Sequence, residues 1–136
     1  MALEALLGKK YKLASSEKFD EYMKALGVGL VTRKVGGAVS PVVDLQKEGE
    51  EYVLSSNSTF KNVVLRFKPG VEFDQDTPDG RKVKSTITVE GNTLKEVQKA
   101  GDGKVTTIDR TWTDDEIKMV MSVGDVTATR TYKLQA

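Results

Sequence analysis

Apolar and polar residues alternate in short runs along most of the chain, and turn-forming residues recur between these runs. From Pro41 onward, turn signals stand at Glu48-Gly49, Pro69-Gly70, Asp79-Gly80, Gly91-Asn92, the Gly101 to Gly103 cluster, Asp114-Asp115 and Gly124-Asp125. Alternation with a period of two places successive side chains on opposite faces of a strand, and closely spaced turns join neighbouring strands in antiparallel order. The pattern therefore predicts an antiparallel meander.

About ten runs have the pattern of strands, and they lie at residues 9–15, 42–47, 51–57, 61–68, 71–76, 81–89, 93–99, 104–112, 116–123 and 126–134. A sheet of so many short strands hides its edges by closing into a barrel or by forming a sandwich. A barrel of about this strand number is too wide for its own side chains to fill. The 136 residues contain no linker-like stretch, so we expect one domain, residues 1–136, with an internal cavity.

Two helices are predicted between the first two strands. In the first, apolar residues recur at helical spacing after Ser15 and Ser16, which we expect to cap the helix, and Gly27 ends it. In the second, residues 29–40 have a weaker apolar pattern that contains Gly36-Gly37 and stops at Pro41, so it should be short.

The composition excludes several classes of function. The formal net charge of +1 gives no reason to expect a nucleic acid as partner. The chain has no His and no Cys, and no phosphate-binding or nucleophile motif, so we expect no enzyme, no cofactor and no metal site. It also has no long apolar run and no secretory signal pattern, from which we expect a cytoplasmic protein.

Two arginines stand where the alternation places the interior of the barrel. Arg130 shares a face of the last strand with Ala128 and Tyr132, and Arg110 shares a face of an earlier strand with Ile108 and Trp112. Two buried guanidinium groups repel each other and need an acceptor. A ligand carboxylate held by Arg110, Arg130 and Tyr132 would supply it.

Other interpretations of the same residues stay open at this point. Arg110 could instead pair with Glu96, which shares a strand face with Leu94 and Gln98, or a bulge could exchange the faces. Trp112 could belong to the core or to the cavity wall. An enzyme that uses Glu96 or Tyr132 for acid–base chemistry has no paired carboxylates to support it.

Several segments carry a resemblance to a known family. "GKKYKLASSEKFDEYMKALGVG", "STFKN", "EFDQDTPDGRKVKS" and "TRTYK" occur in the order and spacing of the intracellular lipid-binding proteins. The chain resembles the fatty-acid-binding proteins of this family over nearly its whole length. An extra residue separates Gly8 from the aromatic Tyr11, and this spacing resembles that of some invertebrate members.

The resemblance implies an all-β, ten-strand antiparallel up-and-down barrel of the lipocalin-like, or calycin, type, capped by a short helix-turn-helix lid. It implies a monomer that carries one long-chain fatty acid, with the carboxylate on Arg110, Arg130 and Tyr132; retinoic acid or another hydrophobic carboxylate is the alternative. Ligand-tail and portal residues carry over to Phe19, Tyr22, Met23, Leu26, Pro41, Ser58 and Phe60, although the helix residues among them are more often simple core contacts. The ligand would enter near Phe60 and Pro78.

Basic residues on the two predicted helices suggest a further partner. Lys24, Arg33 and Lys34 lie on or beside these helices and would allow transient contact with anionic membranes. A solvated polar face is the more common role of such residues.

Overall fold

The computed structural model describes residues 3–59, 62–77 and 81–135. Within these ranges a short 3-10 helix, η1 (Leu3–Leu6), precedes the first strand, β1 (Tyr11–Glu17). Two α-helices follow, α1 (Phe19–Ala25) and α2 (Leu30–Ala38). The remaining strands are β2 (Val42–Glu48), β3 (Glu51–Asn57), β4 (Asn62–Phe67), β5 (Phe73–Asp76), β6 (Lys82–Glu90), β7 (Thr93–Ala100), β8 (Val105–Trp112), β9 (Glu116–Val123) and β10 (Val126–Leu134).

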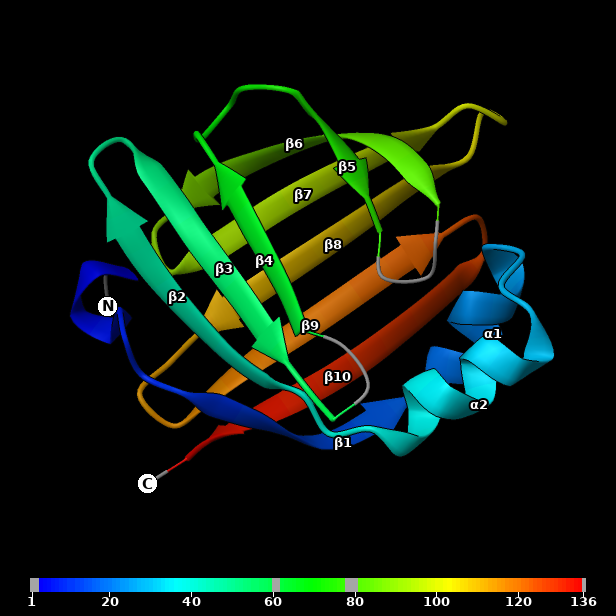
Figure 1. Ribbon diagram of the computed structural model, residues 1–136, viewed down its shortest axis with the longest axis horizontal. Coiled ribbons are helices and arrows are strands. Elements are labelled where there is room, and N and C mark those ends of the chain that lie inside the picture. Colours follow the sequence, from blue (N-terminus) through cyan, green and yellow to red (C-terminus); the bar gives the residue numbers. More distant parts are fainter. Residues whose placement is uncertain (1–2, 60–61, 78–80, 136) are drawn as a thin grey trace.

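The strands form one ten-stranded sheet in the order β4-β3-β2-β1-β10-β9-β8-β7-β6-β5. The pairings within it are antiparallel, and β1 lies between β2 and β10. The sheet curls into a barrel that is nearly closed, with α1 and α2 at one end and η1 at the other (Figure 1). The predicted all-β, ten-strand meander is therefore confirmed.

The N-terminal start of α1 differs from the prediction. Ser15 and Ser16 do not cap the helix, because both belong to β1 and pair with Thr131 and Arg130 of β10. The residue at the N-cap is Lys18, which has a left-handed backbone with φ of 59° and no side-chain capping bond. The register of β1 shifts between Leu13 and Ser15, and this irregularity lets the strand run two residues further than the alternation indicated.

Two clusters of buried apolar side chains fill opposite ends of the barrel. The cluster at the η1 end includes Leu3, Leu6, Tyr11 and Trp112, and the indole is fully buried there. Trp112 is therefore a core residue and does not line the cavity. The second cluster packs α1 against β8, β9 and β10 and consists of Tyr22, Met23, Leu26, Val28, Ile108, Met121, Val123 and Ala128.

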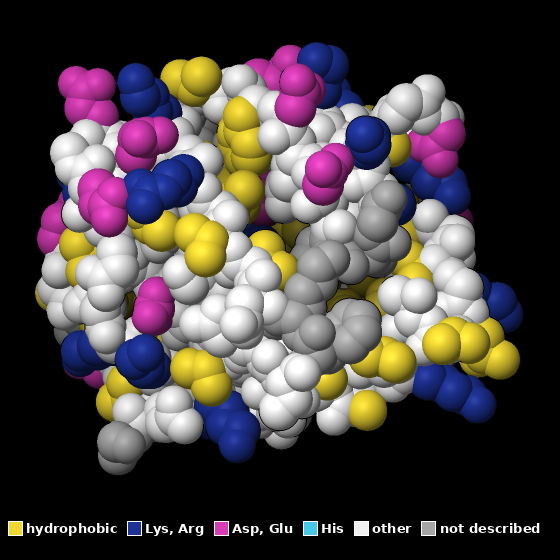
Figure 2. All heavy atoms as spheres, viewed as in Figure 1, with side chains coloured by type: hydrophobic (Ala, Val, Ile, Leu, Met, Phe, Trp, Pro, Cys, Tyr) yellow, Lys and Arg dark blue, Asp and Glu magenta, His cyan; other side chains and the backbone are white. Residues whose placement is uncertain are grey.

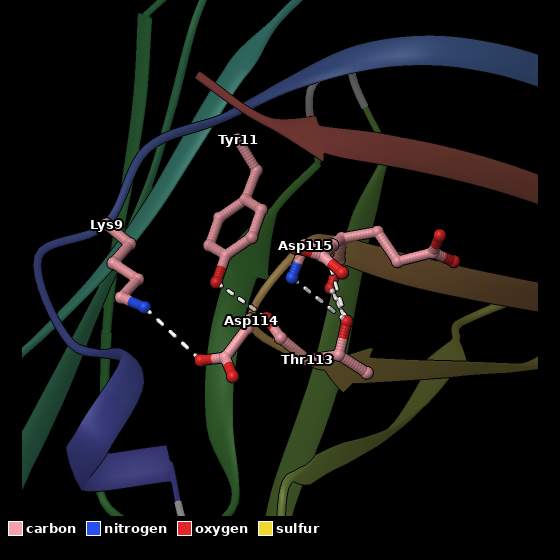
Figure 3. A network of polar contacts seen from close by, with 6 residues as sticks. Lys9, Tyr11, Thr113, Asp114 and Asp115 are labelled. Carbon is pink, nitrogen blue, oxygen red and sulfur yellow. Dashed lines mark hydrogen bonds and ion pairs between the residues drawn. The ribbon is translucent and has the colours of Figure 1, made fainter. Parts of the chain in front are cut away.

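Polar contacts close the η1 end of the barrel (Figure 3). The Tyr11 hydroxyl donates to the Thr113 carbonyl oxygen at 2.8 Å, and Lys9 pairs with Asp114 at 3.3 Å. Burial raises the pKa of Tyr11, and the charges of Asp114 and Asp115 raise it further, so the hydroxyl remains a donor. These contacts join β1 to the β8–β9 turn.

Candidate functional site

The interior of the barrel holds a cavity of about 270 Å³ between the two apolar clusters. Figure 2 shows a hollow near the centre of one face, with hydrophobic side chains visible inside it. Six of the predicted ligand-tail residues line the cavity, namely Phe19, Tyr22, Met23, Leu26, Pro41 and Ser58. Arg110, Arg130 and Tyr132 line it as well. Phe60 and Pro78 lie outside the described residues.

Arg130 is held in the cavity wall by contacts at one edge and one face of its guanidinium group. Its Nε donates to the Ser16 hydroxyl at 3.0 Å, and its Cζ lies 3.9 Å from the centre of the Phe19 ring. Only 6% of the residue is exposed, and Nη2 is buried without a hydrogen-bond partner among the described residues. Burial lowers the pKa of Arg130, an effect that Tyr132 partly opposes. The site thus contains a desolvated cation with a donor unused.

Tyr132 lies two residues further along the same face of β10 and is almost fully buried. Burial raises the pKa of its hydroxyl, while the positive charges of Arg130 and Arg110 act in the opposite direction. Because the net change is upward from the usual value near 10, the hydroxyl is neutral at physiological pH. Tyr132 can therefore donate a hydrogen bond to an anion beside Arg130.

Arg110 already has an anionic partner inside the barrel. Its Nη1 donates to Glu96 Oε1 at 2.8 Å, and Glu96 Oε2 accepts from Gln98 Nε2 at 2.8 Å. The Glu96 side chain is completely buried, whereas Gln98 lines the cavity. The structure therefore contains the Arg110–Glu96 pair that sequence analysis left open, and a ligand is not required as the counterion of Arg110.

The two arginines occupy one row of the sheet. Arg110 of β8 is opposite Met119 of β9, and Met119 is opposite Arg130 of β10. Because one strand lies between them, the Cα atoms of the two arginines are roughly 10 Å apart. Both long side chains can therefore reach one small anionic group that lies between them. The row makes Arg110 and Arg130 neighbours along the cavity wall.

The cavity also contains residues that sequence analysis did not select. Met119 and Met121 line it, and the alternation of residues 116–123 could have identified both, because they share a face with Ile117. Arg81 lines it too, directly before β6, where its backbone N–H donates to the Thr77 hydroxyl at 3.0 Å. Arg81 begins the predicted run 81–89 and shares its face with Val83 and Ile87, so the alternation could have indicated it as well.

At the end of the barrel where α1 and α2 lie, the contacts of Arg33 differ from the expectation for the basic residues. Arg33 Nε donates to Asp20 at 3.1 Å and its Nη1 to the Val28 carbonyl oxygen at 2.8 Å. Only 16% of its side chain is exposed, so Arg33 joins α2 to α1 and is not a free surface cation. Lys24 and Lys34 remain exposed.

The part of the chain that the structure describes contains neither a candidate metal site nor a membrane-spanning helix. No group of three or more acidic, His or Cys side chains there could hold a metal ion. None of the helices in the same ranges combines the length and apolar character that a membrane span requires.

Comparison with known proteins agrees with this geometry. Residues 7–135 match the model of the lipocalin / cytosolic fatty-acid binding protein family. A brain fatty-acid-binding protein of Drosophila melanogaster is 54% identical, with 94% of this chain and 98% of that chain covered and a TM-score of 0.89. Fatty-acid-binding protein 1 of Echinococcus granulosus is 42% identical, with 98% and 99% covered and a TM-score of 0.91.

A third solved structure shares the full length of the chain. The fatty-acid-binding protein of Schistosoma mansoni, solved in complex with arachidonic acid, is 39% identical over 100% of both chains, with a TM-score of 0.93. These matches confirm the predicted resemblance and its invertebrate character.

Proposed function

The chain belongs to the lipocalin / cytosolic fatty-acid binding protein family, and we propose that it binds long-chain fatty acids and transports them in the cytoplasm. We propose that one monomer holds one ligand in its barrel and carries out no catalysis. The similar protein of Schistosoma mansoni was solved with arachidonic acid, which favours a fatty acid over retinoic acid as the ligand class. The single observation that carries the proposal is the buried, unused donor of Arg130 in an otherwise largely apolar cavity.

In this proposal the carboxylate lies between Arg130, Tyr132 and Arg110. Arg130 offers Nη2, and the neutral Tyr132 hydroxyl offers a second donor. Arg110 uses Nη1 for Glu96, so its remaining N–H groups stay available for the ligand. Charge-assisted hydrogen bonds of this kind are about twice as strong as neutral ones.

The hydrocarbon chain would lie against the apolar wall toward the helices. That wall includes Phe19, Tyr22, Met23, Leu26 and Pro41, and the polar residue Ser58 also lies along it. Transfer of a chain of about sixteen carbons out of water contributes roughly 10 kcal/mol before the costs of immobilisation. The tail therefore supplies most of the affinity, and the arginines select the head group.

The proposal includes transient contact with anionic membranes through α2. Leu30 and Val31 at the start of this helix are 57% and 77% exposed, and Lys24 and Lys34 are exposed cations on α1 and α2. Figure 2 shows hydrophobic and basic side chains side by side at the helix end of the molecule. Exposed apolar side chains next to cations are typical of surfaces that adsorb to anionic lipid.

Replacing Val31 with serine tests this contact. We expect ligand transfer to vesicles that contain phosphatidylserine to slow by about threefold, because one exposed apolar anchor is lost. A control variant, Val64→Ser, removes a similarly exposed valine, 60% exposed, from β4 and should transfer ligand at the normal rate. Equal transfer rates for both variants would exclude α2 as the contact surface.

The main test of the proposed function is calorimetric titration of the delipidated protein with hexadecanoic acid and with the alcohol of the same length. We expect the acid to bind with a stoichiometry of about one and at least tenfold more tightly than the alcohol, because only the acid can neutralise the charge of Arg130. Equal affinities would mean that the arginines are neutralised within the protein. Binding of neither compound would refute the proposed function.

A further inference from the structure

Glu96 is a buried acid next to the proposed carboxylate site that the binding scheme itself does not use. It lies on β7, on the same face of the strand as Leu94 and Gln98. Its neighbours on the adjacent strands are Ile87 and Ile108. Both isoleucines are buried, so the described polar partners of the carboxylate are Arg110 and Gln98. A charge in such surroundings is retained only when it is paired.

The charges around the head-group position can be counted from the described residues. Arg110 and Arg130 contribute two positive charges, Glu96 contributes one negative charge, and Tyr132 is neutral. The group therefore carries a net charge of +1. One monocarboxylate neutralises it, whereas a dianionic head group leaves an excess negative charge in a buried site.

Among the described residues, one further cation lines the cavity, and it does not change this count. Arg81 lies directly before β6, about eight residues ahead of Val89 of that strand, and Val89 shares a register row with Leu94 and Arg110. This spacing corresponds to about 26 Å along the strand. Arg81 therefore lies near the other end of the cavity from the two arginines.

We propose that Glu96 makes the site select ligands whose head group carries a charge of −1. It occupies one edge of Arg110, neutralises that side chain and leaves the site matched to a monocarboxylate. It does not contact the ligand, because it does not line the cavity, and it acts through Arg110. The proposal rests on the proposed function, since it names the charge class of the same ligand.

The test compares two ligands of equal chain length at pH 8, hexadecanoic acid and hexadecyl phosphate. At this pH the carboxylate carries one negative charge and the phosphate monoester carries two. The wild-type protein should prefer the carboxylate. In Glu96→Gln the net charge becomes +2, and the affinity ratio should shift at least tenfold toward the phosphate.

Two further variants control the experiment. Glu90→Gln removes an exposed acid that ends β6 and pairs with Lys95, and it should leave the ratio unchanged. The double variant Glu96→Gln/Arg110→Gln returns the site to +1. Because Arg110 is itself a proposed ligand contact, the affinities for both ligands should fall, while their ratio should lie within about threefold of the wild-type ratio. The affinity ratio should follow the net charge of the site across these variants. If Glu96 had only a structural role, the ratio would not follow the charge.

The outcomes separate the inference from the proposed function. If the wild-type protein binds neither ligand, the proposed function fails. If it binds the acid but Glu96→Gln shows the wild-type ratio, the proposed role of Glu96 is wrong. Should Glu96→Gln not fold, the double variant decides, because a ratio far from the wild-type value would overturn the dependence on net charge.

Discussion

Replacing Arg130 with glutamine is expected to weaken the binding of hexadecanoic acid by about 100-fold. The substitution removes the buried cation whose Nη2 has no partner among the described residues, and with it the charge-assisted bonds to the carboxylate. Loss of such bonds costs about 3 kcal/mol, which corresponds to two orders of magnitude in the dissociation constant. Titration calorimetry with the delipidated variant measures the change directly.

The alcohol of the same chain length is the control for this prediction. It cannot use the charge of Arg130, so its affinity for Arg130→Gln should stay within about threefold of the wild-type value. Arg66→Gln provides a matched surface variant, because Arg66 pairs with Glu48 on the exposed side of β4. A loss of acid and alcohol affinity to the same extent would show that Arg130 maintains the shape of the cavity through Ser16 and Phe19.

Replacing Arg110 with glutamine should reduce the free energy of unfolding by about 3 kcal/mol. The substitution leaves the Glu96 carboxylate buried among isoleucines with Gln98 as its remaining described partner. An unpaired buried charge costs far more than the pair itself contributes. Urea unfolding at pH 7, followed by the fluorescence of the buried Trp112, measures the difference.

The double variant Glu96→Gln/Arg110→Gln tests the cause of that loss. Because both charges are removed together, most of the lost free energy should return. Stability equal to that of Arg110→Gln alone would mean that the pair does not explain the effect. An unchanged stability in the single variant would show that the carboxylate finds another partner.

Strand positions and faces followed from the sequence because the two-residue period is maintained through the barrel. The ends of β3, β9 and β10 agree with the predicted runs. The helix start was wrong because Ser15 and Ser16 satisfy a local capping pattern, whereas pairing with β10 determines their conformation. The 3-10 helix η1 was not predicted, because four residues are too few to establish a period.

The candidate site was predictable for the same reason, and only in part. Once the faces are fixed, Arg110, Arg130 and Tyr132 must point inward together, and the structure places all three at the cavity. Sequence analysis named Glu96 as one possible partner of Arg110 but could not choose between it and a ligand, since the pairing depends on the register of β7 against β8. Arg110 is opposite Leu94, which brings Glu96 into reach across the diagonal. The contact of Arg33 with α1 likewise depends on how the helices pack.

The place of β1 in the sheet has a consequence for how the protein is synthesised. β1 is made first, yet one of its two neighbours is β10, which is made last of the ten strands. While the chain is still growing, the edge of β1 that will meet β10 has no strand to pair with, and such edges favour aggregation. The barrel can therefore close only after β10 has emerged from the ribosome, and Arg130 and Tyr132 arrive with the strand that completes it.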